Sequence, residues 1–376
     1  MRVLVVAEVD PAHTGSGAER VLDEHARALH RRGHAVTILS GRARAATRNG
    51  AITVEPVGWS LATPWRVRRA VARLSAAPDA VVLHHPYPGL LVLGARALGG
   101  APVTLVYHSP WHEELRARRV DANASGSAIR RGIERTIVRR VRRVYPLSRF
   151  MAARLHAIHG VAGERVRIVP GGVDRTHFAP PADRGAVRAT LGLPAAACVL
   201  LTVRNLEPRM GLVELLRAMP AIRAARPDAR LVVAGAGALA APLRALARTL
   251  GLLESVSFTG FVPEADLPAL YGAADLSVVP SQSLEGFGLV TLESLACGTP
   301  VVGTPVGATP ELLAPLDPAL VLDGASPDAI GRGILRVLAR NDAPALRARC
   351  RAHTEGYTWD AAMAALEADL AELARR

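Results

Sequence analysis

The chain has 376 residues, half of them apolar, which exceeds what one compact core usually supports, so two domains of ordinary size are expected. The formal net charge is +13, and every basic side chain is arginine because the sequence contains no lysine. This absence excludes a pyridoxal Schiff base and a P-loop of the GxxxxGK[ST] kind, since both depend on a lysine amine. Arginine and alanine recur throughout the predicted helices, so the charge indicates a general composition bias, and we expect no nucleic-acid partner.

The sequence favours a soluble protein of the cytoplasm. No apolar run reaches the roughly 18 to 20 residues that a membrane span needs. The N-terminal stretch "MRVLVVAEVDP" is closed by Glu8 and Asp10, which is typical of a buried strand rather than a signal peptide. Cys198, Cys297 and Cys350 show no CxxC spacing, so we expect them to fill the core rather than to form disulfides or a thiolate metal site.

The N-terminal half alternates strands with helices. A strand from Val3 to Ala7, a glycine-containing loop, an amphipathic helix from about Ala18 to Arg32 and a strand "AVTILS" form a β-loop-α-β unit. Further elements are predicted as strands at 80–85, 103–109, 142–148 and 165–172 and as a helix near 128–143. This order is typical of a parallel sheet with helices on both faces.

A second domain of the same kind follows a linker at 171–185, where "GGVDRTHFAPPADRG" has no periodicity. Its predicted strands are 198–206, 229–237, 256–262, 276–281, 300–304 and 319–324, with helices that begin near Leu212 and after Gly288 among those between them. We therefore expect an α/β chain of two doubly wound domains that face each other across a ligand-binding cleft. The expected domains are 1–178, 179–356 and a final helix at 357–376.

The loop "HTGSGAER" places Gly15 and Gly17 ahead of a helix, where N–H groups can hold an anion. It does not match a dinucleotide fingerprint, because Arg20 occupies the third glycine position and no acidic residue follows the second strand. A tight turn that lets a substrate approach the backbone is the favoured interpretation, and a plain structural turn is the alternative.

Histidines gather at two predicted strand ends. A metal site is not predicted, because Pro110 between His108 and His112 breaks the helical turn that would bring their rings together. His108 follows a strand at the expected cleft, which favours a role in the site. His84 and His85 fit a structural role equally well.

Arg204 and Arg209 flank the turn between a buried strand and the following helix. Two guanidiniums and a helix N-terminus at one place can bind a diphosphate in a protein without lysine. A solvated surface role would suit either arginine alone, but the pair at this turn favours function.

The helix near 128–143 carries arginines on one side of an apolar stripe. A basic amphipathic helix can lie on an anionic membrane. In a chain so rich in arginine, a core-packed helix with a solvated face is the favoured interpretation, and peripheral membrane contact is the alternative. The stripe comprises Ile129, Ile133, Ile137, Val141 and Val144.

The segment "SLEGFGLVTLESLACGTPVV" sets Glu285 before a helix and Glu293 about one turn inside it. A pair of catalytic carboxylates would need one neutral proton donor. Helix amides instead favour ionised carboxylates and bound anions, so neither glutamate is an obvious donor. Ionised carboxylates can accept hydrogen bonds from the hydroxyls of a hexose and a ribose, and the helix N-terminus can hold phosphates between them.

Taken together, these motifs make the chain resemble a retaining GT-B glycosyltransferase of the glycosyltransferase family 4 type. The resemblance covers nearly the whole chain, and its most specific part is the E-x7-E block "EGFGLVTLE" followed by "ACGTPVVGTPVGATPELL". Other matching stretches are "GSGAERVLDEHARALHRRGHAVTIL", "VYHSPW", "YPLSRFMAARL", "RIVPGGVDRTHF", "VRNLEPRMGLVELLRAM", "LVVAGAG", "FTGFV" and "LYGAADLSVVPS".

The resemblance implies a role for each matching residue. Glu285 would contact hydroxyls of the transferred sugar, Glu293 the nucleotide ribose, and His108 would lie beside the reacting carbon. Arg204 would bind the diphosphate, with Arg209 supplying the charge of the lysine that relatives usually carry at Met210. The remaining donor-binding positions are Gly17, the backbone at Phe261 and Val262 for the base, and Gly286, Phe287, Gly288 and Leu289 for the sugar and diphosphate.

The implied reaction moves a hexosyl unit from a nucleoside-diphosphate sugar to a hydroxyl, with retained configuration and without a metal or other cofactor. A uridine diphosphate sugar is the first expectation for the donor and a guanosine one the second. The acceptor can be a polysaccharide, a lipid or a small natural product. Two alternatives remain open, namely a nucleotide-sugar 2-epimerase and a non-catalytic partner protein with the same fold.

Overall fold

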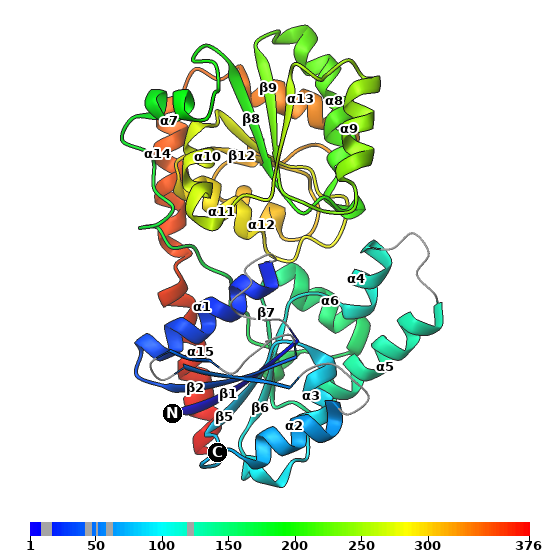
Figure 1. The fold of residues 1–376 in the computed structure, drawn as a ribbon, viewed down its shortest axis with the longest axis vertical. Coiled ribbons are helices and arrows are strands. Elements are labelled where there is room, and N and C mark those ends of the chain that lie inside the picture. Colours follow the sequence, from blue (N-terminus) through cyan, green and yellow to red (C-terminus); the bar gives the residue numbers. More distant parts are fainter. Residues whose placement is uncertain (9–16, 42–46, 50–51, 58–62, 119–123) are drawn as a thin grey trace. The chain divides into compact units, whose positions relative to one another are not determined.

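The computed structural model describes residues 1–8, 17–41, 47–49, 52–57, 63–118 and 124–376 (Figure 1). The chain divides into an N-terminal unit, Met1–Gly171 with Trp359–Arg376, and a C-terminal unit, Gly172–Thr358. The sequence predicts these divisions after residues 178 and 356. The structure moves the first one because the linker packs with the second unit: Val173 forms a β-bridge with Thr358, and the ring of Phe178 lies 6.1 Å from that of Tyr271.

The N-terminal unit is built on a seven-stranded sheet in the order β3-β4-β2-β1-β5-β6-β7. All neighbours pair in parallel except β3, which is antiparallel to β4. The strands are β1 (Arg2–Ala7), β2 (Ala35–Ser40), β3 (Thr47–Asn49), β4 (Ile52–Pro56), β5 (Ala80–Leu83), β6 (Val103–Tyr107) and β7 (Arg143–Pro146). Every residue of β5 and β7 is buried, as expected for parallel strands covered on both faces.

Helices cover this sheet on both sides (Figure 1). They are α1 (Gly17–Arg31), α2 (Thr63–Ala72), α3 (Pro86–Val92), α4 (Trp111–Arg118), α5 (Ala124–Arg140), α6 (Arg149–His159) and α15 (Trp359–Arg375), with short 3₁₀ turns η1 (Arg96–Leu98) and η2 (Gly163–Arg165). The helix predicted from Ala18 to Arg32 and the strands at the start of the chain are confirmed within a residue or two. No strand forms at 165–172, because that segment makes only an isolated bridge between Val166 and Val144.

The C-terminal unit is a second parallel α/β unit with strand order β10-β9-β8-β11-β12. Its strands are β8 (Cys198–Val203), β9 (Ala229–Ala234), β10 (Val256–Gly260), β11 (Leu276–Val279) and β12 (Val301–Gly303). The predicted strand at 319–324 is absent, since the 3₁₀ turn η5 (Pro318–Leu320) leaves only a bridge from Val321 to Gly303. The prediction of two doubly wound units is confirmed.

The helices of the C-terminal unit also cover both faces of its sheet (Figure 1). The helices are α7 (Arg184–Thr190), α8 (Leu212–Ala225), α9 (Ala240–Thr249), α10 (Leu267–Ala273), α11 (Leu289–Ala296), α12 (Thr309–Leu313), α13 (Pro327–Leu338) and α14 (Ala343–His353), with 3₁₀ turns η3 (Pro208–Met210), η4 (Glu264–Asp266) and η6 (Thr354–Gly356). Side-chain caps begin two of these α-helices. In α7, Asp183 accepts from the Ala186 N–H; in α13, Ser326 accepts from the Ala329 N–H and Pro327 occupies the first turn.

The arginine-rich helix α5 differs from its predicted packing. Ile137 and Val138 are fully buried in the core of the N-terminal unit, as a core-packed helix requires. Ile129, assigned to the same buried stripe, is instead 64% exposed. The helix therefore packs on the core with its C-terminal half only. In the described part of the chain, no helix is long and apolar enough to cross a membrane.

The final helix α15 is fastened to the N-terminal unit by a buried carboxylate. Asp369 is fully buried and pairs with Arg143 at 2.9 Å and with Arg167 at 2.9 Å. The Tyr145 hydroxyl donates to the same carboxylate at 2.7 Å. Because β7 supplies both Arg143 and Tyr145, this cluster locks the last helix onto an edge strand of the sheet.

The cluster predicts a large loss of stability when Asp369 is removed. Asp369→Ala leaves the buried Arg143 guanidinium without its carboxylate, which costs about 3–5 kcal/mol of unfolding free energy. Urea denaturation measures this loss. The control is Asp360→Ala on the same helix, whose pair with Arg31 is exposed and 3.6 Å long; equal effects of the two substitutions would contradict the role of Asp369.

Candidate functional site

The predicted site residues of the C-terminal unit come from adjacent strand ends. Arg204 directly follows β8, and Glu285 lies in the loop after β11, the neighbour of β8 in the sheet. Leu284, just before Glu285, has φ 54 and is the one non-glycine residue with positive φ among the described residues. Gly307 allows the close approach of the next loop, because a Cβ there would lie 2.2 Å from the Glu285 carbonyl oxygen. The backbone therefore holds Glu285 in a constrained turn.

A buried ion pair joins the two predicted residues. One terminal nitrogen of Arg204 donates to Glu285 Oε2 at 2.6 Å and to the Ser281 hydroxyl at 2.5 Å. Ser281 in turn donates to the same carboxylate oxygen at 2.8 Å. The Arg204 and Glu285 side chains retain only 4% and 11% of their exposure. Arg204 therefore contacts the glutamate directly and fixes its orientation.

This arrangement keeps Glu285 ionised. Burial raises the pKa of its carboxyl, but the charge and hydrogen bond of Arg204, the Ser281 hydroxyl and the charge of Arg209 together lower it below its usual value. All the contacts that the described residues make with the carboxylate use Oε2. Oε1 is left as an acceptor without a partner among those residues, so Glu285 suits a hydrogen-bonding role and not that of a proton donor.

Arg209 and Met210 lie on the same turn. Arg209 donates to the Leu284 carbonyl at 3.2 Å, so it supports the strained residue next to Glu285. Its guanidinium also lies 3.7 Å from the Glu207 carboxylate. Met210 is buried and its sulfur contacts the Arg204 guanidinium at 3.0 Å. A thioether here can lie against a cation where a lysine ammonium would repel it.

Glu293 lies inside α11 and is 2% exposed. The Tyr271 hydroxyl, from α10, donates to its carboxylate at 2.9 Å. The helix begins at Leu289 after Gly288, whose φ of 96 is left-handed. The first amides of a helix have no intrahelical acceptor, although here the Thr291 N–H already donates to the Gly288 carbonyl at 3.0 Å. Both glutamates of the E-x7-E block are thus oriented by a partner from another element.

The other residues predicted to bind the donor lie near the carboxyl ends of the strands in the C-terminal unit. Gly286 and Leu289 are partly exposed, whereas Phe287 and Gly288 are buried. Phe261, 64% exposed, and Val262 follow β10. Backbone hydrogen bonds join the carboxyl ends of β8, β9 and β10. The Gly235 N–H donates to the Gly260 carbonyl at 2.7 Å, and the Arg204 N–H donates to the Ala234 carbonyl at 2.9 Å.

His108 and Gly17 belong to the N-terminal unit. Gly17 is the first residue of α1 and is exposed, while the rest of the loop "HTGSG" lies outside the described residues. His108 follows β6, and its Nε2 lies 3.3 Å from Nδ1 of His84. His84 also meets His25 edge-on, with ring centroids 5.2 Å apart. The three rings form a chain of contacts that starts at the end of β6: His108 contacts His84, and His84 contacts His25. We call His25, His84 and His108 the histidine cluster.

Burial keeps the histidine cluster neutral. It lowers the pKa of His25 to about 3, with a further contribution from His108. It also lowers the pKa of His108 to about 4, where Glu114 acts in the opposite sense and His85 in the same sense. The pKa of His84 lies well below its ordinary value for the same reason, with the other two histidines adding to it. At neutral pH, His108 is a hydrogen-bonding group and a weak base.

Two family models match the two halves of the chain. The model described as "Glycosyltransferase Family 4" matches residues 15–177, and that described as "Glycosyl transferases group 1" matches residues 183–356. The chain belongs to the GT-B glycosyltransferases of the family 4 type. The fold and family expected from the E-x7-E block and its surroundings are confirmed.

Curated relatives of this glycosyltransferase chain cover only part of it. A D-inositol 3-phosphate glycosyltransferase from Segniliparus rotundus is 36% identical over 217 residues, 56% of this chain and 47% of the relative. A GDP-mannose-dependent alpha-(1-6)-phosphatidylinositol monomannoside mannosyltransferase from Mycolicibacterium smegmatis is 33% identical over 257 residues, 64% of this chain and 66% of the relative. The matches thus span about half to two thirds of these relatives.

A solved structure matches along nearly the whole length. Sucrose-phosphate synthase from Thermosynechococcus elongatus superposes with a TM-score of 0.84 at 22% identity, covering 99% of both chains. At this identity the match establishes the GT-B fold alone.

The partners that orient the two glutamates are not predicted from the sequence. Ser281 and Tyr271 stand in "LYGAADLSVVPS", and the spacing Ser281 to Glu285 could have indicated a contact across the turn. The pairing of Arg204 with Glu285 had no local signal, because the two residues are 81 positions apart. Among the described residues, no group of three or more His, Cys, Asp and Glu side chains is arranged to hold a metal ion; metal independence stays a prediction.

The histidine cluster predicts acid-sensitive stability. In the unfolded chain these histidines bind protons below about pH 6.5, whereas in the folded state His25 and His108 stay neutral down to about pH 3 and 4. The unfolded state therefore binds more protons between these values. Unfolding free energy falls on acidification through this window, by up to about 1.4 kcal/mol per pH unit for each histidine.

Urea denaturation at pH 7 and pH 5 measures this dependence. His25→Gln removes one titrating group and is expected to make the dependence shallower. His156→Gln, on an exposed residue of α6, serves as the control and is expected to leave it unchanged. An unaltered dependence in His25→Gln would contradict the buried neutral cluster.

Proposed function

We propose that the protein is a retaining glycosyltransferase that moves a hexosyl unit from a nucleoside-diphosphate sugar to a hydroxyl group of an acceptor. The observation that carries the proposal is the state of the Glu285 carboxylate. Its Oε2 accepts a hydrogen bond from Arg204, which lowers the pKa of the carboxyl and keeps it ionised, and its Oε1 can accept hydrogen bonds from a ligand. An ionised carboxylate held in this way can bind two adjacent sugar hydroxyls but cannot protonate a leaving group.

The remaining donor contacts follow from the same unit. The N-terminus of α11, immediately after Gly288, presents amides to an anion, which suits the diphosphate. Glu293, oriented by Tyr271, is assigned to the ribose hydroxyls. Arg209 is assigned to the diphosphate as the second cation of this turn, where its guanidinium also donates to the Leu284 carbonyl at 3.2 Å. One terminal nitrogen of Arg204 already donates to Glu285 and Ser281, so the proposed contact of Arg204 with the diphosphate would use the rest of its guanidinium.

The proposed chemical step needs little proton transfer by the protein. The bond between the anomeric carbon and the diphosphate oxygen breaks, the acceptor oxygen bonds to the same carbon on the same face, and the acceptor proton passes to the departing phosphate. Negative charge grows on that phosphate, where the helix N-terminus and Arg209 would stabilise it. His108, with its pKa lowered to about 4, fits a hydrogen-bonding role beside the reacting carbon better than that of a general base.

The choice of donor base stays a proposal. A uridine diphosphate sugar is our first expectation and a guanosine diphosphate sugar the second. The name of the Mycolicibacterium smegmatis relative includes GDP-mannose, so guanosine donors belong in every test. The names of both curated relatives point to inositol-containing acceptors, one a phosphate and one a lipid.

The proposal predicts that Glu285→Gln loses transfer and keeps nucleotide binding. A hydrogen bond to a charged group contributes about 1.5–3 kcal/mol, so kcat/KM for transfer is expected to fall roughly tenfold to a hundredfold or more. The assay is nucleoside diphosphate release from the donor, with nucleotide affinity measured by calorimetry on the same samples. Glu254→Gln, on an exposed residue of the same unit, is the control. Wild-type transfer by Glu285→Gln would remove Glu285 from the site.

A further inference from the structure

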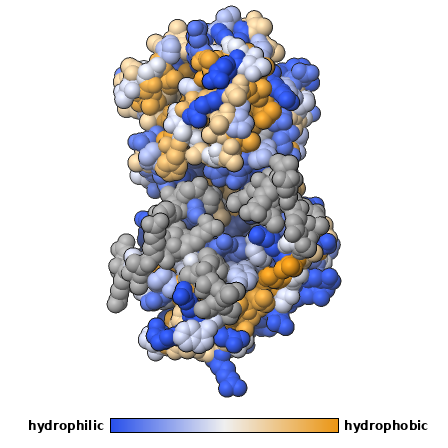
Figure 2. Space-filling model, turned by 45° about the vertical axis from the view of Figure 1, so that its right-hand side comes forward, coloured by the Kyte–Doolittle hydropathy of each residue, from blue (hydrophilic) through white to orange (hydrophobic). Residues whose placement is uncertain are grey.

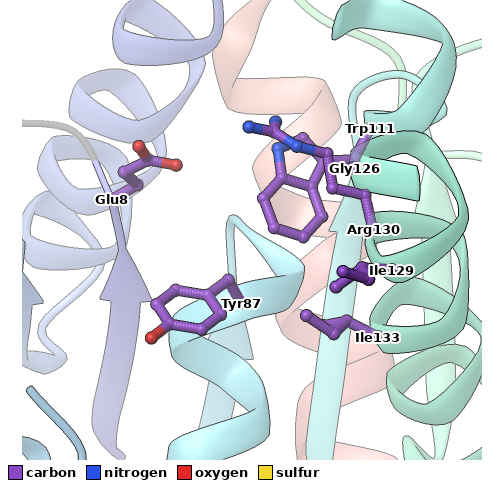
Figure 3. Close-up of a pocket in the computed structure, with 7 residues that line it drawn as sticks. All are labelled: Glu8, Tyr87, Trp111, Gly126, Ile129, Arg130 and Ile133. Carbon is purple, nitrogen blue, oxygen red and sulfur yellow. The ribbon is translucent and has the colours of Figure 1, made fainter. Parts of the chain in front are cut away.

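The N-terminal unit contains a pocket of about 370 Å³ that the donor-site assignments do not use. It lies between the end of β1, the start of α3 and the helices α4 and α5 (Figure 3). Its volume falls in the range of small-molecule sites. The lining residues are Glu8, Tyr87, Trp111, Gly126, Ile129, Arg130 and Ile133.

Tyr87 and Trp111 contribute aromatic rings to the pocket from different sides (Figure 3). Trp111 and Tyr87 are tilted by 33° with ring centroids 6.4 Å apart. His85 packs edge-on against Trp111 at 4.8 Å and caps α3 by accepting from the Tyr87 N–H. These contacts come from both sides of the pocket, so the rings are held in place before any ligand binds.

Charge is distributed unevenly around the pocket. Glu8, on one side, pairs with His85 at 3.0 Å. On the other side, the Arg130 guanidinium lies over the Trp111 ring at 4.5 Å (Figure 3). Within the described residues, Arg130 makes this cation–π contact and no ion pair. A guanidinium stacked on an indole keeps its N–H donors available at the ring edge for an anion.

The pocket continues into exposed apolar surface. Ile129 is 64% exposed at its edge, although sequence analysis places it in a buried stripe. The view in Figure 2 shows a band of apolar residues on the N-terminal unit among polar ones. Of the exposed large apolar side chains described in this unit, Trp65, Ile129 and Ile168, only Ile129 lines the pocket.

A buried carboxylate fixes the two helices that form the pocket. Glu134, on α5 beside Ile133, is fully buried and accepts from the Trp111 N–H at 3.2 Å. The same carboxylate lies 3.3 Å from Nδ1 of His112 and 3.5 Å from Nε2 of His159. Burial raises the pKa of Glu134, but its contacts with the two histidines and the hydrogen bond from the Trp111 amide lower it overall. The start of α4 is therefore anchored to α5.

We propose that this pocket binds the acceptor and selects molecules that carry an apolar group together with an anionic group. The apolar group would lie on Trp111, Ile129 and Ile133, and the anion would pair with Arg130. This assignment rests on the proposed transferase function. Its place near the reaction is supported by His85, which packs on Trp111 and acts electrostatically on His108.

A neutral sugar acceptor fits the pocket less well. Sugars stack on aromatic rings, but their hydroxyls need polar partners around the ring edge. Here Ile129, Ile133 and the Arg130 cation lie on the same side as Trp111 (Figure 3). Across the pocket, Glu8 and Tyr87 supply the polar groups, and the Glu8 carboxylate is already paired with His85 at 3.0 Å. The two sources of the proposed chemistry are a membrane lipid with an anionic headgroup and a soluble amphipathic molecule.

Binding of naphthyl glucuronide and naphthyl glucoside to the full chain tests the proposal. The two probes share an apolar ring system and sugar hydroxyls and differ in one carboxylate. Naphthyl fluorescence anisotropy is expected to show saturable binding that is at least tenfold tighter for the glucuronide. Arg130→Gln is expected to abolish that difference, and Ile129→Glu to weaken both probes at least tenfold.

Matched controls lie close by. Arg131→Gln alters the next arginine of α5, and Ile168→Glu alters an exposed isoleucine outside the pocket; both are expected to bind the probes as the wild type does. Absence of saturable binding, or a glucuronide preference that survives Arg130→Gln, would overturn the proposal. So would equal affinity of the wild type for the two probes.

Vesicles distinguish the two sources of ligand. Co-sedimentation with phosphatidylglycerol but not phosphatidylcholine vesicles, lost in Arg130→Gln, would assign the apolar group to a lipid. Glucuronide binding without vesicle binding would assign it to a soluble acceptor. Nucleotide affinity, measured for every variant, separates this inference from the transferase proposal. Probe binding without nucleotide binding would contradict the transferase proposal but not the binding pocket. Nucleotide binding without probe binding would contradict the binding pocket alone.

Discussion

The buried pair of Arg204 and Glu285 is the interaction on which the candidate donor site depends. Two charges at 2.6 Å with little solvent must satisfy each other, because separating them would leave a buried ion uncompensated. The pair therefore fixes the loop after β11 to the end of β8. Ser281 within that loop and Met210 on the turn after β8 also contact the Arg204 guanidinium. The hydrogen bonds from Arg204 and Ser281 fix the orientation of the Glu285 carboxylate.

The backbone around the pair is arranged to suit it. Leu284 adopts a left-handed conformation, which costs energy for a residue with a side chain, and Arg209 donates to its carbonyl. Gly307 lets the following loop pass close enough for the Ala308 N–H to donate to the Glu285 carbonyl at 2.9 Å. A strained turn persists when the surrounding contacts determine it, and here those contacts come from two other segments, the turn after β8 and the loop before α12.

The candidate site residues of the two units differ in charge. In the C-terminal unit, the site residues are charged and paired, which suits a diphosphate and sugar hydroxyls. In the N-terminal unit, burial leaves His25, His84 and His108 neutral, and the cation Arg130 lies at a pocket edge. In the proposed site, neutral His108 beside the reacting carbon would not compete with the donor for the charges that hold the donor. The proposed division of labour between donor and acceptor follows from this contrast.

Much of this architecture can be predicted from the sequence, for physical reasons. Buried strands such as 276–279 and amphipathic helices such as α1 carry their own periodicity, and the E-x7-E block places both glutamates at a helix start. Contacts between distant segments are not encoded locally, so the pairing of Arg204 with Glu285 and of Tyr271 with Glu293 was not predicted. Short apolar runs also mislead: 165–172 and 319–324 resemble strands, but each makes only a single bridge. The exposure of Ile129 was not predicted either, because helical periodicity shows which residues share one face of a helix but not how far along the helix that face is covered by the core.

The most direct test of the donor assignment is a thermal-shift panel with UDP, GDP, dTDP, ADP and NAD on the wild type and on Glu293→Gln. A nucleotide at about a hundred times its dissociation constant adds roughly 2.7 kcal/mol to the stability of the folded state. The account predicts a shift with a nucleoside diphosphate, a smaller shift in Glu293→Gln and none with NAD. Absence of a shift with all four nucleoside diphosphates, or an equal shift in the variant, would contradict it.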